Sequence, residues 1–127
     1  MKLRGVRGAI TVESDTPETV LAATRKLLRA MITANAIDPD DVASVFLTTT
    51  PDLTAVFPAV AARQLGWLNV PLMGAQEAPI AGALPRCVRI LIHLNTAKRP
   101  EEIQHVYLGG AVNLRGPVPP LPEDELE

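Results

Sequence analysis

One central strand of this chain is predicted by Cys87-Val88-Arg89-Ile90-Leu91-Ile92-His93-Leu94, a run whose apolar residues and length are typical of a buried strand. Arg89 lies in the middle of this run, and Arg7 has a similar setting within Val6-Arg7-Gly8-Ala9-Ile10. A guanidinium group does not give up its charge, so it needs an anionic partner or a wet cavity beside it. Two interpretations stay open: a pocket for a negatively charged guest, or a pair of buried salt bridges to Asp or Glu.

Composition limits the class of protein. The 127 residues are enough for one domain that buries roughly two-thirds of its unfolded surface. Aromatic residues make up only 3%, so the core must be aliphatic. A net charge of -2 gives no field that attracts nucleic acid, and no apolar run approaches the roughly 20 residues of a membrane span. The single cysteine excludes an internal disulfide and no targeting signal is recognisable, so we expect a cytoplasmic protein.

The first half of the chain predicts a strand followed by a long helix. Residues 3–12 have a strand pattern in which Leu3, Gly5, Arg7 and Ala9 share one face. The sequence Asp15-Thr16-Pro17-Glu18 has the capping oxygen, the early proline and the acid of a helix start. Asn35 is expected to end this helix in a left-handed conformation. The apolar face of the helix consists of Val20, Leu21, Thr24, Leu27, Leu28, Met31 and Ile32.

The rest of the chain predicts strands that alternate with short helices. The predicted strands are 45–50, 67–72, 87–94 and 105–108, and the predicted helices or turns are 38–41, 58–66 and 100–103. This order is typical of a mixed α/β (α+β) fold in which helices cover one face of the sheet. The other face needs a cover as well, so packing against further copies is expected. Residues 116–127 are proline-dense and acidic, and we expect them to be disordered.

The chain carries few ordinary catalytic groups. Cys87 lies inside an apolar run, and His93 and His105 have no metal-ligand spacing to an acid or a thiol, so no metal site is expected. His93 shares strand parity with Arg89, and we interpret it as a structural histidine. The glycines form neither a phosphate-binding loop nor a dinucleotide fingerprint, so no cofactor is expected.

What remains is a set of cations with a few hydrogen-bonding groups. Arginines hold carboxylates by paired N–H donors, and they stabilise negative charge that grows during a rearrangement without proton transfer. Glu77 and Tyr107 are the candidate hydrogen-bonding partners, although Glu77 also fits a rim position. Arg4, Arg86 and Arg115, taken singly, are more typical of a solvated surface. The candidate cations are Arg4, Arg7, Arg63, Arg86, Arg89 and Arg115.

Six short strings, taken together and in order, resemble one family. They are Arg4-Gly5-Val6-Arg7-Gly8-Ala9, Thr50-Pro51-Asp52-Leu53 with Ala55-Val56-Phe57-Pro58-Ala59, Val70-Pro71, Gln76-Glu77, Cys87-Val88-Arg89-Ile90 and His105-Val106-Tyr107-Leu108. The chain is similar to monofunctional chorismate mutases of the trimeric pseudo-α/β-barrel class. The resemblance runs from residue 1 to about 115, which makes 1–115 the expected catalytic domain and 116–127 a tail.

The resemblance implies an enzyme that converts chorismate to prephenate, in phenylalanine and tyrosine biosynthesis, by a Claisen rearrangement without cofactor, metal or general base. It assigns Arg7 and Arg89 to the carboxylate and ether-oxygen ends of the substrate, with Arg89 facing the oxygen that gains negative charge. Glu77 would accept a hydrogen bond from the ring hydroxyl. These three, Arg89, Glu77 and Arg7, are the catalytic residues that the resemblance implies.

The resemblance also implies a homotrimer with active sites at subunit interfaces. Further substrate-binding positions are Phe57 and Arg63 from a neighbouring subunit, Met73 and Gly74, Tyr107 as a donor to a side-chain carboxylate, and Leu114 and Arg115 in a closing C-terminal segment. Gly74 departs from the family pattern, which has cysteine or serine shortly before the glutamate. Two alternatives to a chorismate mutase remain: a non-catalytic module that binds small dicarboxylates, and a trimeric deaminase-like enzyme of similar architecture.

Overall fold

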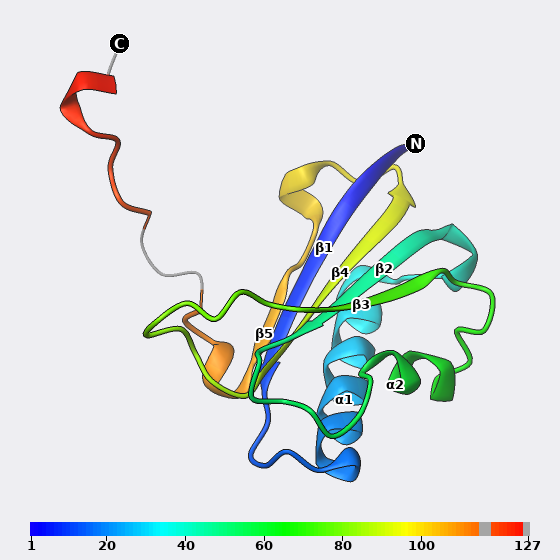
Figure 1. Ribbon diagram of the computed structural model, residues 1–127. Coiled ribbons are helices and arrows are strands. Elements are labelled where there is room, and N and C mark those ends of the chain that lie inside the picture. The colour runs from blue at the N-terminus through cyan, green and yellow to red at the C-terminus, as the bar shows by residue number, and fades with distance from the viewer. Residues whose placement is uncertain (115–117, 126–127) are drawn as a thin grey trace.

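A five-stranded sheet with two helices on one side forms the body of the protein (Figure 1). The computed structural model describes residues 1–114 and 118–125. The elements are β1 (Lys2–Thr11), α1 (Pro17–Asn35), η1 (Pro39–Asp41), β2 (Val42–Thr49), α2 (Ala59–Gln64), β3 (Leu72–Gln76), β4 (Cys87–Thr96), η2 (Pro100–Glu102), β5 (Val106–Leu108), η3 (Gly109–Ala111) and η4 (Glu123–Glu125). The predicted mixed sheet with helices on one face is confirmed.

The sheet has the strand order β3-β2-β4-β1-β5, which puts β4 at its centre. Strand β4 pairs antiparallel with both β1 and β2, and the outer strands β5 and β3 pair parallel with β1 and β2. The β1–β4 ladder is long, because it runs from Lys2 opposite Thr96 to Thr11 opposite Cys87. The two strands on which the sequence places arginines are therefore direct neighbours.

Helix α1 starts as predicted but ends differently. The Thr16 side chain accepts a hydrogen bond from the Thr19 backbone N–H, and Pro17 is the first helical residue. Ala36, rather than Asn35, adopts the left-handed conformation, with φ 51° and ψ 50°. The prediction for Asn35 was wrong because its buried amide instead bonds to the backbone of Gln104 at 2.8 Å through both its nitrogen and its oxygen.

The core lies between the sheet and the helices. Helix α1 contributes Val20, Leu27, Leu28 and Met31, which pack against the helix-facing side chains of the sheet. Gly8 permits the close approach of α1 to β1, because a Cβ atom at this position would come within 2.4 Å of the Met31 sulfur. The side chains of the sheet in this core are Val6, Ile10, Val45, Leu47, Val88, Ile90, Ile92 and Leu94.

The predicted strand 67–72 was wrong. The strand in this region is β3 at Leu72–Gln76, one edge of the sheet, and four of its five residues are exposed. The segment before it is a loop in which Trp67, 3% exposed, packs into the core. Trp67, Val70 and Leu72 therefore serve packing, whereas Leu68 is exposed. The residues that pair with β2 begin only at Leu72.

The C-terminal residues that the structure describes, 118–125, are all exposed and include the short turn η4. Positions 115–117 and 126–127 lie outside the described residues, and so does part of the tail for which disorder is expected. Within the described ranges, no helix is long and apolar enough to cross a membrane.

Candidate active site

Alternation along β4 separates the two faces of the sheet. Val88, Ile90, Ile92 and Leu94 are buried toward the helices, whereas Cys87, Arg89, Leu91 and His93 belong to the opposite face, here called the open face. The Arg89 side chain is 43% exposed, and Arg7 on β1 is exposed as well. Both arginines thus lie on a solvent-accessible face. Of the two open interpretations, a pair of buried salt bridges does not describe them: Arg89 pairs with Glu77 at a partly exposed position, and Arg7 is exposed.

A cavity of about 340 Å³ opens on this face. It brings Arg7 and Arg89 together with Tyr107 and Leu114, four of the residues selected from the sequence. Apolar groups supply most of the remaining wall. The other lining residues are Gly8, Ala9, Phe46, Thr48, Ile90 and Leu91.

The strand register explains why these side chains meet. Thr48 on β2 lies opposite Arg89 on β4, Arg89 lies opposite Ala9 on β1, and Ala9 lies opposite Tyr107 on β5. A second row, one pleat away, places both Phe46 and Arg7 opposite Leu91. Side chains directly opposite each other in a sheet are within contact distance, so the two rows form one continuous patch.

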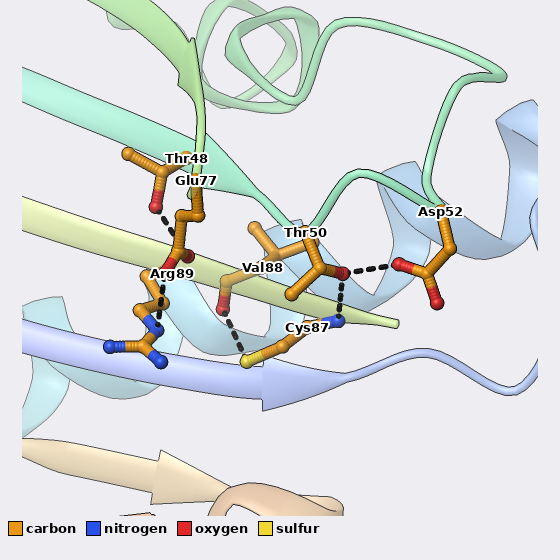
Figure 2. Close-up of polar contacts among 7 residues, drawn as sticks. All are labelled: Thr48, Thr50, Asp52, Glu77, Cys87, Val88 and Arg89. Atoms are coloured by element: carbon orange, nitrogen blue, oxygen red, sulfur yellow. Dashed lines mark hydrogen bonds and ion pairs between the residues drawn. The ribbon is translucent and has the colours of Figure 1, made fainter. Parts of the chain in front are cut away.

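Glu77 is the carboxylate that the structure pairs with Arg89 (Figure 2). Its Oε1 lies 3.1 Å from Arg89 Nε, and its Oε2 accepts a hydrogen bond from the Thr48 hydroxyl at 2.8 Å. Among the described residues, Arg89 Nε makes no hydrogen bond of acceptable angle, so charge rather than a directed bond holds the pair. Glu77 directly follows β3, and its backbone N–H donates to the Thr49 carbonyl at 2.9 Å.

A second group of contacts fixes the start of β4 (Figure 2). The Thr50 hydroxyl accepts from the Cys87 backbone N–H at 3.0 Å and donates to Asp52, and Asp52 also accepts from the Arg86 backbone N–H at 2.9 Å. The hydrogen bond from Thr50, reinforced by that from Arg86, lowers the pKa of the Asp52 carboxyl. The predicted surface residue Arg86 is exposed but also donates its Nε to the Val12 carbonyl.

Cys87 belongs to a small apolar cluster on the open face. Its thiol is buried with Ala9 and Ala111, and Leu84, Tyr107 and Leu114 pack around this cluster. Burial is the main cause that raises the pKa of the Cys87 thiol, so this sulfur stays protonated and apolar near neutral pH. Tyr107 and Leu114 therefore pack on this cluster and line the cavity at the same time.

Five expected site residues are not among those that line this cavity. Glu77 is one of them, although it pairs with Arg89 beside the cavity. Phe57, 80% exposed, precedes α2, and Arg63 is an exposed residue of α2 itself. Met73 and Gly74 are exposed on the edge strand β3. Arg115 lies outside the described residues. Within this chain, the structure therefore does not bring the positions around α2 or on β3 into the cavity of Arg7 and Arg89.

The loop that carries Phe57 is held by an acid at the start of α1. The Asp15 carboxylate accepts hydrogen bonds from the backbone N–H groups of Thr54 and Ala55 at 3.0–3.1 Å. The Thr54 backbone N–H has the largest effect in lowering the pKa of Asp15. Phe57 is exposed, and yet it follows a segment whose backbone is fixed.

Both histidines have structural partners. His93 Nδ1 lies 2.9 Å from the Ser44 hydroxyl, and its ring meets Phe46 edge-on at a centroid distance of 5.6 Å, so it has the partners that a structural histidine requires. His105 Nδ1 accepts from the Arg7 backbone N–H at 3.0 Å. Across the residues that the structure describes, no group of three or more His, Cys, Asp or Glu side chains is arranged for a metal ion.

Sequence reasoning missed Thr48, Phe46 and Leu91 as cavity residues. For Leu91 a signal existed, because it shares strand parity with Arg89. For Thr48 and Phe46 the necessary information is the register of β2 against β4, which the sequence does not provide.

Comparison with known proteins gives one consistent result. Residues 3–118 match the family described as chorismate mutase type I. Chorismate mutase AroH of Thermus thermophilus is 52% identical over 114 residues, which are 89% of this chain and 93% of that protein. Chorismate mutase AroH of Bacillus subtilis (strain 168) is 46% identical over 116 residues, 91% of each chain. The solved structure of a chorismate mutase from Clostridium thermocellum has a TM-score of 0.84 and 44% identity, covering 85% of this chain and 96% of its own.

Proposed function

The chain belongs to the chorismate mutase type I family, and we propose that it rearranges chorismate to prephenate in the cavity on the open face of its sheet. The observation that carries this assignment is that Arg7 and Arg89, from neighbouring strands, line one cavity. Chorismate has two carboxylates and an ether oxygen, and guanidinium groups bind such oxygens through paired donors. The cavity thus supplies cations where the substrate is anionic.

The first task of the site is to hold the substrate in a reactive shape. The two reacting ends of chorismate must meet in a compact conformation, and fixed contacts at both ends lower the entropic part of the barrier. Arg7 holds a carboxylate, and Tyr107 donates to the side-chain carboxylate. Glu77 accepts from the ring hydroxyl. The apolar wall of Phe46 and Leu91 gives the ring carbons a surface to pack against.

The second task is to stabilise charge that appears during the reaction. As the C–O bond breaks, negative charge grows on the ether oxygen, and Arg89 faces this oxygen. Because the charge is larger in the transition state than in the substrate, a fixed cation binds the transition state more strongly. No proton is transferred in this rearrangement, so the structural roles of His93 and of the protonated Cys87 thiol are compatible with the assignment.

We propose that the active protein is a homotrimer and that each site is completed by a neighbouring subunit. Phe57 and Arg63 would enter the cavity of the next subunit, beside Met73 and Gly74, and Leu114 and Arg115 would close it. The exposure of large apolar side chains supports this arrangement: Phe57 is 80% and Met73 61% exposed, and Leu3 on the open face is 54% exposed. Such surfaces are typical of interfaces between copies.

We assign residues 1–115 to the catalytic domain and 116–127 to a tail, and we propose a cytoplasmic location within phenylalanine and tyrosine biosynthesis. The family match over 3–118 supports the domain assignment. The only cysteine is buried and forms no disulfide, which is typical of proteins from a reducing compartment.

The activity is tested with purified protein and chorismate in buffer without metal or nucleotide. We expect the ultraviolet absorbance of chorismate to disappear and prephenate to form, with a rate proportional to protein concentration. Absorbance that stays constant at high protein concentration contradicts the assignment. Chorismate binding by calorimetry without turnover identifies the dicarboxylate-binding module instead.

The shared site is tested by mixing two inactive variants. Arg7→Ala and Phe57→Ala remove groups that the proposal places on different subunits of one site. Mixed trimers, formed by co-expression, then contain some sites with both groups intact, about one quarter for random assembly in equal amounts. Activity that stays at the level of the separate variants contradicts a shared site, and size-exclusion chromatography with light scattering reports the trimer.

A further inference from the structure

We propose that Thr48 is a positioning residue of the reaction: its hydroxyl holds the Glu77 carboxylate so that Arg89 keeps its terminal nitrogens for the substrate. This inference rests on the proposed function. Thr48 lines the cavity on β2, directly opposite Arg89 on β4. Its Oγ1 donates to Glu77 Oε2 at 2.8 Å, while Glu77 Oε1 lies 3.1 Å from Arg89 Nε.

The geometry of this ion pair is unusual in one respect. A carboxylate and a guanidinium commonly form two parallel hydrogen bonds at about 2.7–2.9 Å. Here the contact runs from Arg89 Nε to Glu77 Oε1, its distance of 3.1 Å is longer, and its angle does not make a hydrogen bond. Figure 2 shows the terminal nitrogens of Arg89 directed away from Glu77.

The Thr48 hydroxyl explains why Glu77 and Arg89 do not form two parallel hydrogen bonds. One of the two oxygens of Glu77 is already bound to Thr48, so the carboxylate does not turn both oxygens toward the guanidinium. Both side chains come from fixed positions: Thr48 from the middle of a three-strand region, and Glu77 from a residue whose backbone is bonded to Thr49. The charge of Glu77 still lies near Arg89 and orients it, but the donors at the end of the side chain stay available.

Removal of the hydroxyl should therefore let Glu77 close on Arg89 as a two-bond pair. The substrate would have to break that pair before it binds, and the pair would weaken the binding of the transition state by the same amount. A loss of binding that is equal for the substrate and the transition state raises KM and leaves kcat nearly unchanged. A hydrogen bond to a charged group corresponds to a change of about tenfold or more, so we expect KM to rise by about tenfold in Thr48→Val.

The experiment compares Thr48→Val, which keeps the shape of the side chain, with Thr48→Ser, which keeps the hydroxyl. We expect a KM about tenfold higher for Thr48→Val, a kcat within about threefold of the original protein, and a KM close to the original for Thr48→Ser. Thr49→Val is the matched control, because Thr49 is the next residue of β2 and belongs to the helix-facing parity of Val45 and Leu47. Thermal unfolding of all variants verifies that they are folded.

A second measurement asks whether Thr48 acts through Glu77. In a Glu77→Ala background, Thr48→Val should change KM by less than about twofold, because the carboxylate that it restrains is gone. An unchanged KM in Thr48→Val, an equal rise in Thr48→Ser, or an undiminished effect in the Glu77→Ala background overturns the inference. These outcomes require an active original protein, whereas absence of turnover in that protein overturns the proposed function itself.

Discussion

The two faces of strand β4 differ in what their side chains contact. Toward the helices, Ile90 and Ile92 are 2% and 0% exposed and contribute to a continuous aliphatic core. Toward the open face, Arg89 and His93 make polar contacts to Glu77 and Ser44. The helix-facing side therefore stabilises the fold by burying apolar surface. The open face carries charged and polar groups, whose burial would cost more free energy than a small core supplies. Stability and chemistry are separated by the alternation of a single strand.

Arg89→Ala is the substitution with the largest expected effect. It removes the cation that the proposed function places at the breaking C–O bond, and it should raise the activation barrier by about 3 kcal/mol or more, a loss of at least roughly a hundredfold in kcat. The free energy of unfolding should stay unchanged, since the side chain is 43% exposed and lies on the face of β4 opposite the core. Steady-state kinetics and denaturant unfolding measure the two quantities. A variant that unfolds with little change in kcat would contradict the separation of the faces.

Gly8→Ala and Gly5→Ala test the same separation on β1. At Gly8 the added Cβ meets the Met31 sulfur at 2.4 Å, so we expect a loss of about 1–3 kcal/mol in the free energy of unfolding. At Gly5 the added Cβ meets only Leu91 Cδ1 at 3.5 Å, an ordinary contact. Gly5→Ala should be neutral or stabilising by up to about 1 kcal/mol. Equal losses in both variants, measured by urea unfolding, would show that the open face is packed as tightly as the helix side.

His93→Asn sharpens the comparison within the open face itself. The substitution removes the contacts of the imidazole with Ser44 and Phe46, which should cost about 1 kcal/mol in unfolding free energy. Because the reaction needs no base, kcat should stay within about twofold of the original. The measurement is the pair of unfolding and kinetic assays on one preparation. A large fall in kcat with unchanged stability would assign His93 to the chemistry.

The smallest effect concerns the acid that fixes the start of β4. The folded state lowers the pKa of Asp52 below its ordinary value of 3.8, so folding disfavours proton binding there. The stabilisation is therefore complete above pH 3.8 and decreases as pH falls through the lowered pKa of the folded state. The difference in unfolding free energy between the original protein and Asp52→Asn should shrink below pH 3.8. A difference that is constant from pH 5 to 2.5 would exclude this role.

Much of the fold was predictable where a local signal exists. Helix α1 has both an apolar period and a cap at Thr16, and the central strand is a continuous apolar run. Strand β3 was not predictable, because this exposed edge strand, Leu72–Gln76, has no alternation of apolar and polar residues to detect. The end of α1 was misplaced because Asn35 makes its bonds to Gln104, which is distant in the sequence.

The candidate site was likewise predictable only where a local signal exists. Arg7 and Arg89 stand out in the sequence because a permanent charge interrupts an apolar strand, and the structure brings both to one cavity. The resemblance to chorismate mutases of this class is confirmed by the family match. The Glu77–Thr48 contact depends on the pairing of three strands, which no local pattern encodes. A role of Phe57 and Arg63 in this site requires a second copy of the chain and stays a prediction.

The short parallel pairing of β5 with β1 has a consequence for how the enzyme becomes active during synthesis. Tyr107 reaches the cavity only because Val106–Leu108 pairs with Gly8–Ile10, and the nearby bond between Arg7 and His105 spans 98 residues. Contacts between such distant segments form late, because a long loop must close first. A nascent chain on the ribosome therefore lacks one wall of this cavity until β5 has emerged, so the cavity is completed only after β5 has been synthesised and not when the first helix folds.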